Sequence, residues 1–290
     1  MLKKRITACL VIKNGIVVQS IGFTKYLPIG RPSIAVEFLS KWGIDEIVLL
    51  DIDATLQRRK PNLEVIREVS KKCFIPLTVG GGINEPEDIK RLTHCGADKI
   101  CINKVALETP KIISESADVL GRQCIVVSID VKKKREGKYD VVADSGTMSM
   151  DMDPVKWAKQ VETLGAGEIL LNSVDKDGCG KGYDLDLIRM VAEAVSIPVI
   201  ACGGVGHPRH FLEGAVNAGA SAVAAANFFH FTEHSLITTK SFLRIQDMDV
   251  RLDTYADYKD IAFQETGRIS KRYDQYLDRL RFEHHPEEVI

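Results

Sequence analysis

The chain has 290 residues, of which 45% are hydrophobic and 27% are charged, and its formal net charge is −1. A chain of this length and apolar content can bury a full core as one large α/β domain, and its composition is not that of a disordered protein. The balanced charge excludes the basic field with which proteins recruit nucleic acid. The seven cysteines are scattered and include no C-x-x-C pair, so we expect buried thiols of a reducing cytoplasm.

No targeting, membrane or metal signal stands out. Residues 1–5 are basic and lead into an expected strand rather than into the apolar core of a signal peptide. The stretch 214–229 is rich in small residues and broken by asparagines, so it does not predict a membrane span. His207 and His210 lack the Cys or carboxylate cluster that would complete a metal site. We therefore expect a soluble cytoplasmic protein without metal or other cofactor and without membrane or nucleic-acid partners.

An apolar strand opens shortly after a helix-closing glycine at four places in the chain. These places are residues 43–47, 96–100, 165–169 and 219–223. Between them we expect strands at residues 6–11, 76–80, 125–130 and 198–202, and helical patterns such as 62–72 and 185–195. Eight such βα units, made as two similar halves, predict a (β/α)8 TIM barrel over residues 1–250. A doubly wound open sheet is the alternative, which is disfavoured because nothing marks a nucleotide crossover.

One strand-and-glycine segment occurs twice in the chain. Residues 75–83 and 197–205 are each a short apolar run that is entered through Ile-Pro and ends in glycines, and Gly81 and Gly203 are 122 residues apart (203 − 81). This pattern is typical of a buried parallel strand that turns into a helix. Glycines let backbone N–H groups approach an anion, so each copy predicts a phosphate cradle. Two tight turns without a ligand are the alternative.

Polar residues follow the expected strands, at the end where TIM barrels carry their chemistry. They are Asp51, Asp53, Gly81, Gly82, Asn103, Asp130, Asn172, Asp175, Asp177, Gly203, Gly204 and Asn227. Asp130 ends a largely apolar run, where burial would raise the pKa of its carboxyl group toward general acid–base use. An aspartate of a turn or helix start is the alternative. The repeat of the two halves places the partner of Asp130 at Val11, which cannot transfer a proton.

Charged residues occupy the opposite ends, the starts of the strands. Glu46, Lys99 and Glu168 take the same position on three alternate strands, so we expect them to point into the barrel as one layer, with Arg5 from the first strand. Buried charges rarely stabilise a fold better than well-packed apolar side chains do, so this layer indicates polar passage or docking. A solvated salt-bridge cluster on the rim is the alternative.

Residues 251–290 fall outside the eightfold pattern and are dense in charge. Apolar and aromatic residues at helical spacing predict a helix there, with one face formed by Ile269, Tyr273, Tyr276 or Leu277, and Leu280. Further aromatic residues lie upstream at Tyr255, Tyr258 and Phe263. We therefore expect a C-terminal helical extension whose aromatic surface packs on the barrel's own wall or binds a partner.

Several segments together resemble the HisF family, the cyclase subunit of imidazole glycerol phosphate synthase, over about residues 1–252. The resemblance is carried by residues 4–10, 79–83, 96–99, 165–171, 175–178 and 229–231. It implies a half-barrel duplication that holds a substrate with two phosphate groups and receives ammonia from a glutaminase docked at the strand starts. The implied substrate and phosphate sites comprise Gly81, Gly82, Asn103 and Asp51 on one side and Gly203, Gly204, Asn227 and Asp177 on the other. The implied ammonia gate consists of Arg5, Glu46, Lys99 and Glu168.

The chain also departs from the family pattern. Family cyclases use two aspartates, at the positions of Val11 and Asp130, and a loop lysine where this chain has Gln19. These departures, with the additional tail, resemble the HisF-related proteins of bacterial surface-sugar pathways. Together with a glutaminase, those proteins supply ammonia to a separate sugar amidotransferase that makes an acetamidino group. On this resemblance we expect an ammonia conduit without cyclase activity, whose residues 251–290 contact that amidotransferase.

Two other functions remain as alternatives. The first is an active imidazole glycerol phosphate synthase cyclase (lyase) subunit in histidine biosynthesis. Loss of a general acid–base group typically lowers the rate about 10²- to 10⁴-fold, so this alternative requires that Asp51 or Asp177 act with Asp130. The second is a noncatalytic scaffold that binds a phosphorylated ligand. The sequence therefore leaves open whether the chain is an enzyme.

Overall fold

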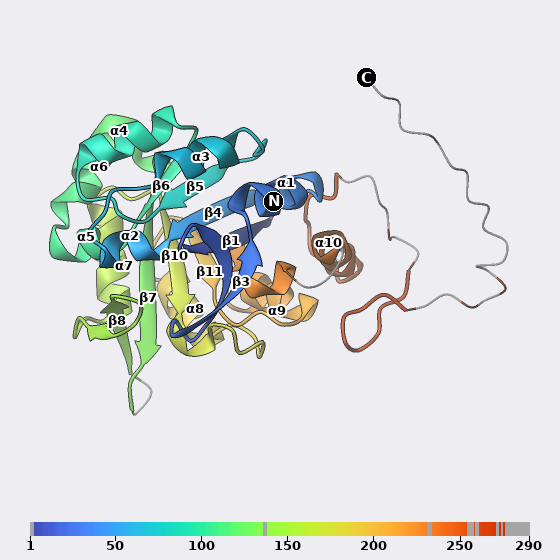
Figure 1. The fold of residues 1–290 in the computed structure, drawn as a ribbon. Helices are drawn as coiled ribbons and strands as arrows, with labels where there is room; N and C mark the ends of the chain where they lie inside the picture. The colour runs from blue at the N-terminus through green and yellow to red at the C-terminus, as the bar shows by residue number, and fades with distance from the viewer. Residues whose placement is uncertain are drawn as a thin grey trace, which may run out of the picture.

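The computed structural model describes residues 3–135, 138–230, 234–253, 258, 261–270, 273 and 275. In these residues eight parallel strands close into a barrel, because β10 pairs with β11 on one side and with β7 on the other. The barrel strands are β1 (Arg5–Lys13), β4 (Glu46–Asp51), β5 (Leu77–Gly80), β6 (Lys99–Ile102), β7 (Ile125–Lys133), β10 (Glu168–Ser173), β11 (Val199–Cys202) and β12 (Ala222–Ala225). The predicted (β/α)8 barrel is confirmed, and the open sheet is excluded (Figure 1).

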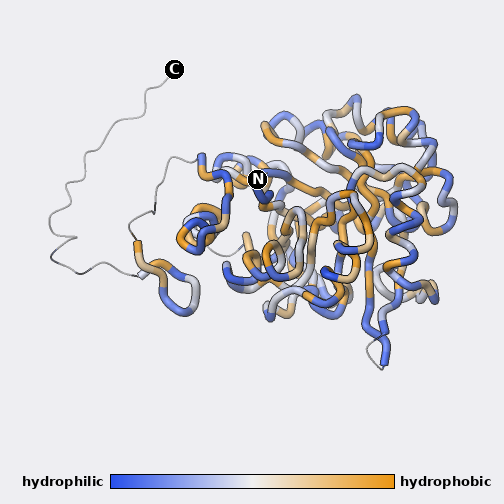
Figure 2. Tube along the Cα trace, turned by 180° about the vertical axis from the view of Figure 1, so that it is seen from behind, coloured by the Kyte–Doolittle hydropathy of each residue, from blue (hydrophilic) through white to orange (hydrophobic). Residues whose placement is uncertain are grey.

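Helices surround the barrel and cover its outer face (Figure 1). They are α1 (Pro32–Lys41), α2 (Ile52–Leu56), α3 (Leu63–Ser70), α4 (Pro86–His94), α5 (Lys104–Glu108), α6 (Lys111–Leu120), α7 (Pro154–Thr163), α8 (Leu185–Ala192), α9 (Pro208–Leu212) and α10 (Ser235–Ile245). Figure 2 shows hydrophobic segments running through the middle of the barrel and hydrophilic segments in the outer turns. Among the described residues, no helix has both the length and the apolar content needed to cross a bilayer.

Each half of the barrel begins with a strand that continues into an antiparallel hairpin. β1 leads into β2 (Ile16–Ile21) and β3 (Lys25–Gly30), and β7 leads into β8 (Tyr139–Ala143) and β9 (Met148–Ser149). Because both hairpins follow the carboxyl end of a barrel strand, they add walls above the strand ends. A hairpin at the same place in each half supports the half-barrel duplication.

The interior of the barrel is lined by alternate strand residues, most of which are small. The interior cluster comprises Cys9, Val48, Cys101, Val126, Leu170, Ile200, Cys202, Ala222 and Ala224. The other strand faces pack against the helices in a much larger apolar cluster, in which Trp157 and Phe211 are fully buried. The expectation of buried thiols is confirmed for Cys9, Cys101 and Cys202 in this interior and for Cys95 outside it. Cys73 and Cys124 are only partly buried, and Cys179 is exposed in the loop after β10, where the expectation is wrong.

The C-terminal extension differs from the prediction in its described residues. Residues 261–270 form a turn that is closed by an antiparallel bridge between Phe263 and Ile269, so the predicted helix is wrong at Ile269, whereas Gln275, further along the predicted helix, is helical. The bridge to Phe263 holds Ile269 in an extended pairing, and Gly267, with a φ of +75°, lies in the turn between these two residues. Phe263 packs edge-on against Phe242 of α10, with ring centroids 5.6 Å apart.

The predicted aromatic surface of the extension is described only in part. Besides Phe263, Tyr258 contacts the body of the protein, because its hydroxyl lies 2.8 Å from Nδ1 of His234. Tyr273 is exposed. The remaining residues of the predicted surface lie outside the described residues, namely Tyr255, Tyr276, Leu277 and Leu280.

Candidate functional site

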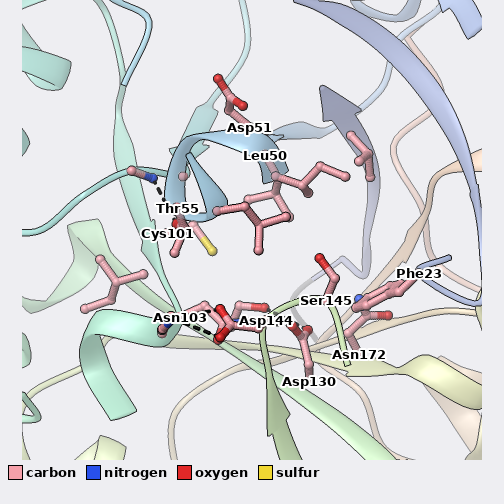
Figure 3. A pocket seen from close by; sticks show the side chains of 18 of the residues that line it. Phe23, Leu50, Asp51, Thr55, Cys101, Asn103, Asp130, Asp144, Ser145 and Asn172 are labelled. Atoms are coloured by element: carbon pink, nitrogen blue, oxygen red, sulfur yellow. Dashed lines mark hydrogen bonds and ion pairs between the residues drawn. The ribbon is translucent and has the colours of Figure 1, made fainter. Parts of the chain in front are cut away.

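Two neighbouring cavities open at the carboxyl ends of the barrel strands. The first cavity has a volume of about 550 Å³ and collects six of the predicted site residues, which are Asp51, Gly81, Gly82, Asn103, Asp130 and Asp177. Asp51, Asn103 and Asp130 are labelled in Figure 3. The second cavity has a volume of about 660 Å³ and contains the other three, Gly203, Gly204 and Asn227. Asp177, Cys202 and Ala226 line both cavities. The two halves of the barrel therefore each supply one cavity, and the cavities adjoin at Asp177.

Asp130 lies on β7 at the bottom of the first cavity (Figure 3). The side-chain amide of Asn103 donates to its Oδ2 at 2.7 Å, and the Ser128 hydroxyl donates weakly to its Oδ1 at 3.4 Å. Burial raises the pKa of the Asp130 carboxyl group to about 6, although the hydrogen bonds from Asn103, Ser128 and Asn172 oppose the shift. A carboxyl group that titrates near neutral pH can both give and take a proton.

Valine occupies the first-strand position that the repeat pairs with Asp130. Val11 lines the same cavity and pairs in the sheet with Leu50 of β4. Its isopropyl group can pack but cannot transfer a proton. Any second acid or base must therefore come from another wall of the first cavity.

Asp177 fits the role of second acid better than Asp51 does. Asp51 caps α2 and accepts a hydrogen bond from the Arg59 guanidinium at 2.7 Å, which holds it as a structural carboxylate. Asp177 instead accepts from the Ser20 hydroxyl at 2.6 Å, and burial raises the pKa of its carboxyl group. The charge of Asp177 also contributes to the raised pKa of Asp130. The two acids are thus electrostatically linked, and buried acids with raised pKa values are typical of functional sites.

The glycine cradles in the two halves have the same construction. Gly81 has φ +106° and Gly203 has φ +97°. A Cβ atom on Gly81 would lie 2.1 Å from the backbone oxygen of Asp51, and one on Gly203 would lie 2.8 Å from that of Ser173. Only glycine fits at either position. Within the described part of the chain, the N–H groups of Gly81 and Gly203 donate to no other residue, so both are available to a ligand.

Asn227 plays a different part from the other predicted residues of the second cavity. Its side-chain amide donates to the backbone oxygen of Ser20 at 2.6 Å, and its Oδ1 accepts from the Ser20 N–H at 3.2 Å. These two bonds occupy the amide group and pin β2 to the carboxyl end of β12. Asn227 therefore positions the wall that carries Gln19 and Ser20 between the two cavities.

The four charged residues at the strand starts form a closed ring, which we call the charged layer. Arg5 contacts Glu46 at 2.7 Å and Glu168 at 2.8 Å, and Lys99 contacts the same two carboxylates at 2.9 Å each. The Glu46 side chain is 1% exposed and that of Glu168 is 11% exposed. The alternative of a solvated rim cluster does not fit these buried carboxylates. The charged layer crosses the barrel below the small interior side chains.

The comparisons with known proteins agree with this architecture. A family profile described as "Histidine biosynthesis protein" matches residues 5–235. A protein named as subunit hisF2 of imidazole glycerol phosphate synthase, from Vibrio vulnificus (strain YJ016), is 44% identical over 268 residues, which cover 92% of this chain and 98% of the relative. The HisF subunit of Bacillus cereus (strain G9842) is 45% identical over 252 residues, which cover 87% of this chain and 100% of the relative. This chain belongs to the HisF family.

The relatives differ in how much of this HisF-family chain they match. HisF of Clostridium botulinum (strain Okra / Type B1) is 45% identical over 253 residues, which cover 87% of this chain and 100% of the relative. The hisF2 alignment is 16 residues longer than that with Bacillus HisF (268 − 252). The added coverage indicates that hisF2 shares more of this chain than the two HisF subunits do.

Sequence reasoning on this HisF-family chain missed the residues that the hairpins bring to the first cavity. Phe23 and Tyr26 come from the β2–β3 hairpin, and Asp144 and Ser145 follow β8 (Figure 3). The repeat of the two halves was the available signal, because both hairpins follow the first strand of a half-barrel. Two predicted strand-end acids line neither cavity. Asp53 binds Lys13 at 2.8 Å, and Asp175 accepts from the backbone N–H of Lys133 at 2.6 Å. In the described residues, no cluster of three or more metal-ligating side chains occurs.

Replacing Asp130 is expected to change how the stability of this HisF-family chain depends on pH. The pKa of the Asp130 carboxyl group is higher in the folded chain, so this group loses its proton at a lower pH in the unfolded chain than in the folded one. The free energy of unfolding therefore falls as pH rises from about 4 to about 6. Asp130→Asn removes this penalty. The free energy of unfolding of Asp130→Asn should exceed that of the unchanged chain by about 1 kcal/mol more at pH 8 than at pH 5. Urea unfolding at both pH values measures the difference, and an equal gain at the two values would contradict the raised pKa.

Proposed function

We propose that this HisF-family chain is the ammonia-accepting synthase subunit of a glutamine amidotransferase of the imidazole glycerol phosphate synthase type. The observation that carries the proposal is the pairing of two sites on one barrel. Two glycine-cradled cavities lie at the strand ends, and the charged layer lies at the strand starts. The names of its relatives support the same reading.

The cavities suit a ligand with two phosphate groups. Gly81 and Gly82 cradle one group in the first cavity, and Gly203 and Gly204 cradle the other in the second. Since the two cavities adjoin at Asp177, one extended molecule can span both. Its central part then lies over Asp130, the buried acid of the first cavity.

The other end of the barrel suits the entry of ammonia from a glutaminase. The interior above the charged layer is lined in part by small side chains, including Cys9 and Ala224, which leave room for a small neutral molecule. Phe74 lies in the loop before β5, on the strand-start face, and is 87% exposed. An exposed aromatic side chain of this kind suits the centre of a protein interface. The glutaminase is therefore proposed to dock on this face.

The comparisons favour the histidine pathway over the surface-sugar pathway as the setting of the reaction. The relatives carry the name imidazole glycerol phosphate synthase, and none of the three is named for a sugar pathway. The first candidate function is therefore the cyclase (lyase) reaction of histidine biosynthesis. Asp130 would transfer one proton and Asp177, the other buried acid with a raised pKa, would serve as its partner.

One observation favours a second candidate, an ammonia conduit that serves a separate sugar amidotransferase. Val11 supplies no proton-transfer group beside Asp130, and Gln19 supplies no charge to the second cavity. The alignment with hisF2 covers 92% of this chain, against 87% for the alignment with Bacillus HisF. In this candidate the charged layer and the barrel interior deliver ammonia, and the cavities hold a phosphorylated ligand without closing a ring.

An assay with ammonia separates the two candidates. The purified chain is given the bisphosphate substrate of the family cyclases and an ammonium salt, and the cyclised product is measured. Formation of product that Asp130→Asn and Asp177→Asn each abolish supports the first candidate. Binding of the substrate without product supports the second. Failure of the chain to bind the substrate or to activate a glutaminase would contradict the proposal as a whole.

A further inference from the structure

The turn of the C-terminal extension forms one wall of the second cavity. Its residues Thr266, Gly267, Arg268 and Ile269 line that cavity together with Gly203 and Gly204. The turn is internally closed, because the Gln264 N–H donates to the Arg268 carbonyl at 2.8 Å and the Gly267 N–H donates to the Gln264 carbonyl at 2.9 Å. The extension thus contributes to the lining of a site that the barrel residues alone do not complete.

Contacts with the barrel hold this turn in one place. Nδ1 of His207 accepts the backbone N–H of Arg209, so its Nε2–H donates to the Glu265 carbonyl at 3.0 Å. Gly267 is buried, and a Cβ atom there would lie 2.6 Å from Cδ of Pro208. Together with the packing of Phe263 on α10, these contacts leave the turn little freedom to move away from the cavity.

The polar groups of the second cavity suit an anion. Within the described part of the chain, the N–H groups of Gly203 and Gly204 donate to no other residue, and Arg268 forms no ion pair. Arg268 is also the sole basic side chain among the described residues that line this cavity. The acid of the cavity, Asp177, is bound by the Ser20 hydroxyl at 2.6 Å and does not neutralise Arg268. Thr266 adds a hydroxyl group on the same side.

We propose that the extension completes the second cavity as a phosphate site, with the Arg268 guanidinium as the counter-charge for a phosphate monoester cradled by Gly203 and Gly204. This inference rests on the proposed function for the cradles and adds a residue that lies outside the barrel. A guanidinium matches a phosphate with two parallel N–H donors, and such charged hydrogen bonds are about twice as strong as neutral ones. The extension is then part of the ligand site and not only a surface for partners.

The test titrates inorganic phosphate into the full chain labelled with [15N]glycine and follows the glycine amide resonances. In the unchanged chain, the Gly81 and Gly82 signals report the first cradle, and those of Gly203 and Gly204 report the second. Arg268→Gln should raise the midpoint for the second cradle about five- to tenfold and leave the first unchanged. Arg268→Lys, which keeps the charge, should recover most of the loss.

Arg244→Gln is the matched control, because Arg244 is exposed on α10 and lines neither cavity. It should leave both midpoints unchanged. Equal midpoints in the unchanged chain and in Arg268→Gln would overturn the role of Arg268 while leaving the cradles intact. Absence of any response from Gly203 and Gly204 in the unchanged chain would instead overturn the second cradle of the proposed function, and the inference with it.

Discussion

If the chain is the ammonia conduit of the second candidate, the double variant Val11→Asp, Gln19→Lys is expected to turn over the cyclase substrate about 10²- to 10⁴-fold faster than the unchanged chain, with ammonia as the nitrogen donor. Val11 and Asp130 line the same cavity, so a carboxyl group at position 11 lies where it can act with Asp130 on one ligand. Gln19 lines the second cavity, where a lysine adds a cation near the cradle of Gly203 and Gly204. Initial rates of product formation at saturating substrate measure the effect.

Two controls separate proton transfer from a change of shape. Val11→Asn in the same Gln19→Lys background has nearly the same size as the aspartate variant but cannot exchange a proton, so it should show no gain. Asp130→Asn added to the double variant should remove the gain. If the initial rate of the unchanged chain is within tenfold of that of the double variant, the prediction fails. In that case, loss of the activity in Asp177→Asn would identify Asp177 as the partner of Asp130.

Lys99→Met is expected to destabilise the fold by about 3 kcal/mol and to uncouple a bound glutaminase from amination. The substitution removes one cation from a ring whose two cations and two carboxylates balance. Glu46, whose side chain is 1% exposed, and Glu168 then share Arg5 alone. An uncompensated buried carboxylate costs more than the ion pair contributes. Thermal or urea unfolding measures the stability, and glutamate released per aminated product measures the coupling.

One control for this prediction keeps the positive charge at position 99, and the other makes the numbers of cations and carboxylates in the charged layer equal again. Lys99→Arg keeps the cation and should retain most of the stability. Lys99→Met combined with Glu168→Gln removes one charge of each sign, so it should regain a large part of the lost stability without restoring the coupling. An unchanged ratio of glutamate to product in both Lys99→Met and this double variant would contradict a role of the charged layer in ammonia transfer.

Local patterns were sufficient for the barrel and for much of the candidate site. Apolar runs located the eight strands, four of them opened by helix-closing glycines, since a buried parallel strand needs apolar residues on both faces. The end of such a run also located Asp130, because a carboxyl group at that position is removed from water and its pKa rises. The repeated Gly81 and Gly203 predicted two equivalent cradles, and both require glycine in the structure.

The C-terminal extension shows where the same reasoning failed. The spacing of Ile269 and Tyr273 is helical, but a pattern of apolar positions does not record the left-handed angle that Gly267 adopts. That angle is useful only because Gly267 packs against His207 and Pro208, about 60 residues earlier in the chain. Such a long-range contact fixes the turn that pairs Ile269 with Phe263, and the local pattern of apolar residues does not predict it.

The sequence by itself determined the fold class, the two halves, the cradles and which charged residues start the strands, because each follows from the order of residues along one element. Only the tertiary structure decided which of these groups meet. Arg5 joins Glu46 and Glu168 across separations of 41 and 163 residues, and the halves adjoin at Asp177. Closing the barrel brings such distant positions within hydrogen-bond reach. Periodicity along a strand shows which residues point inward, but it cannot show which partner stands opposite each of them.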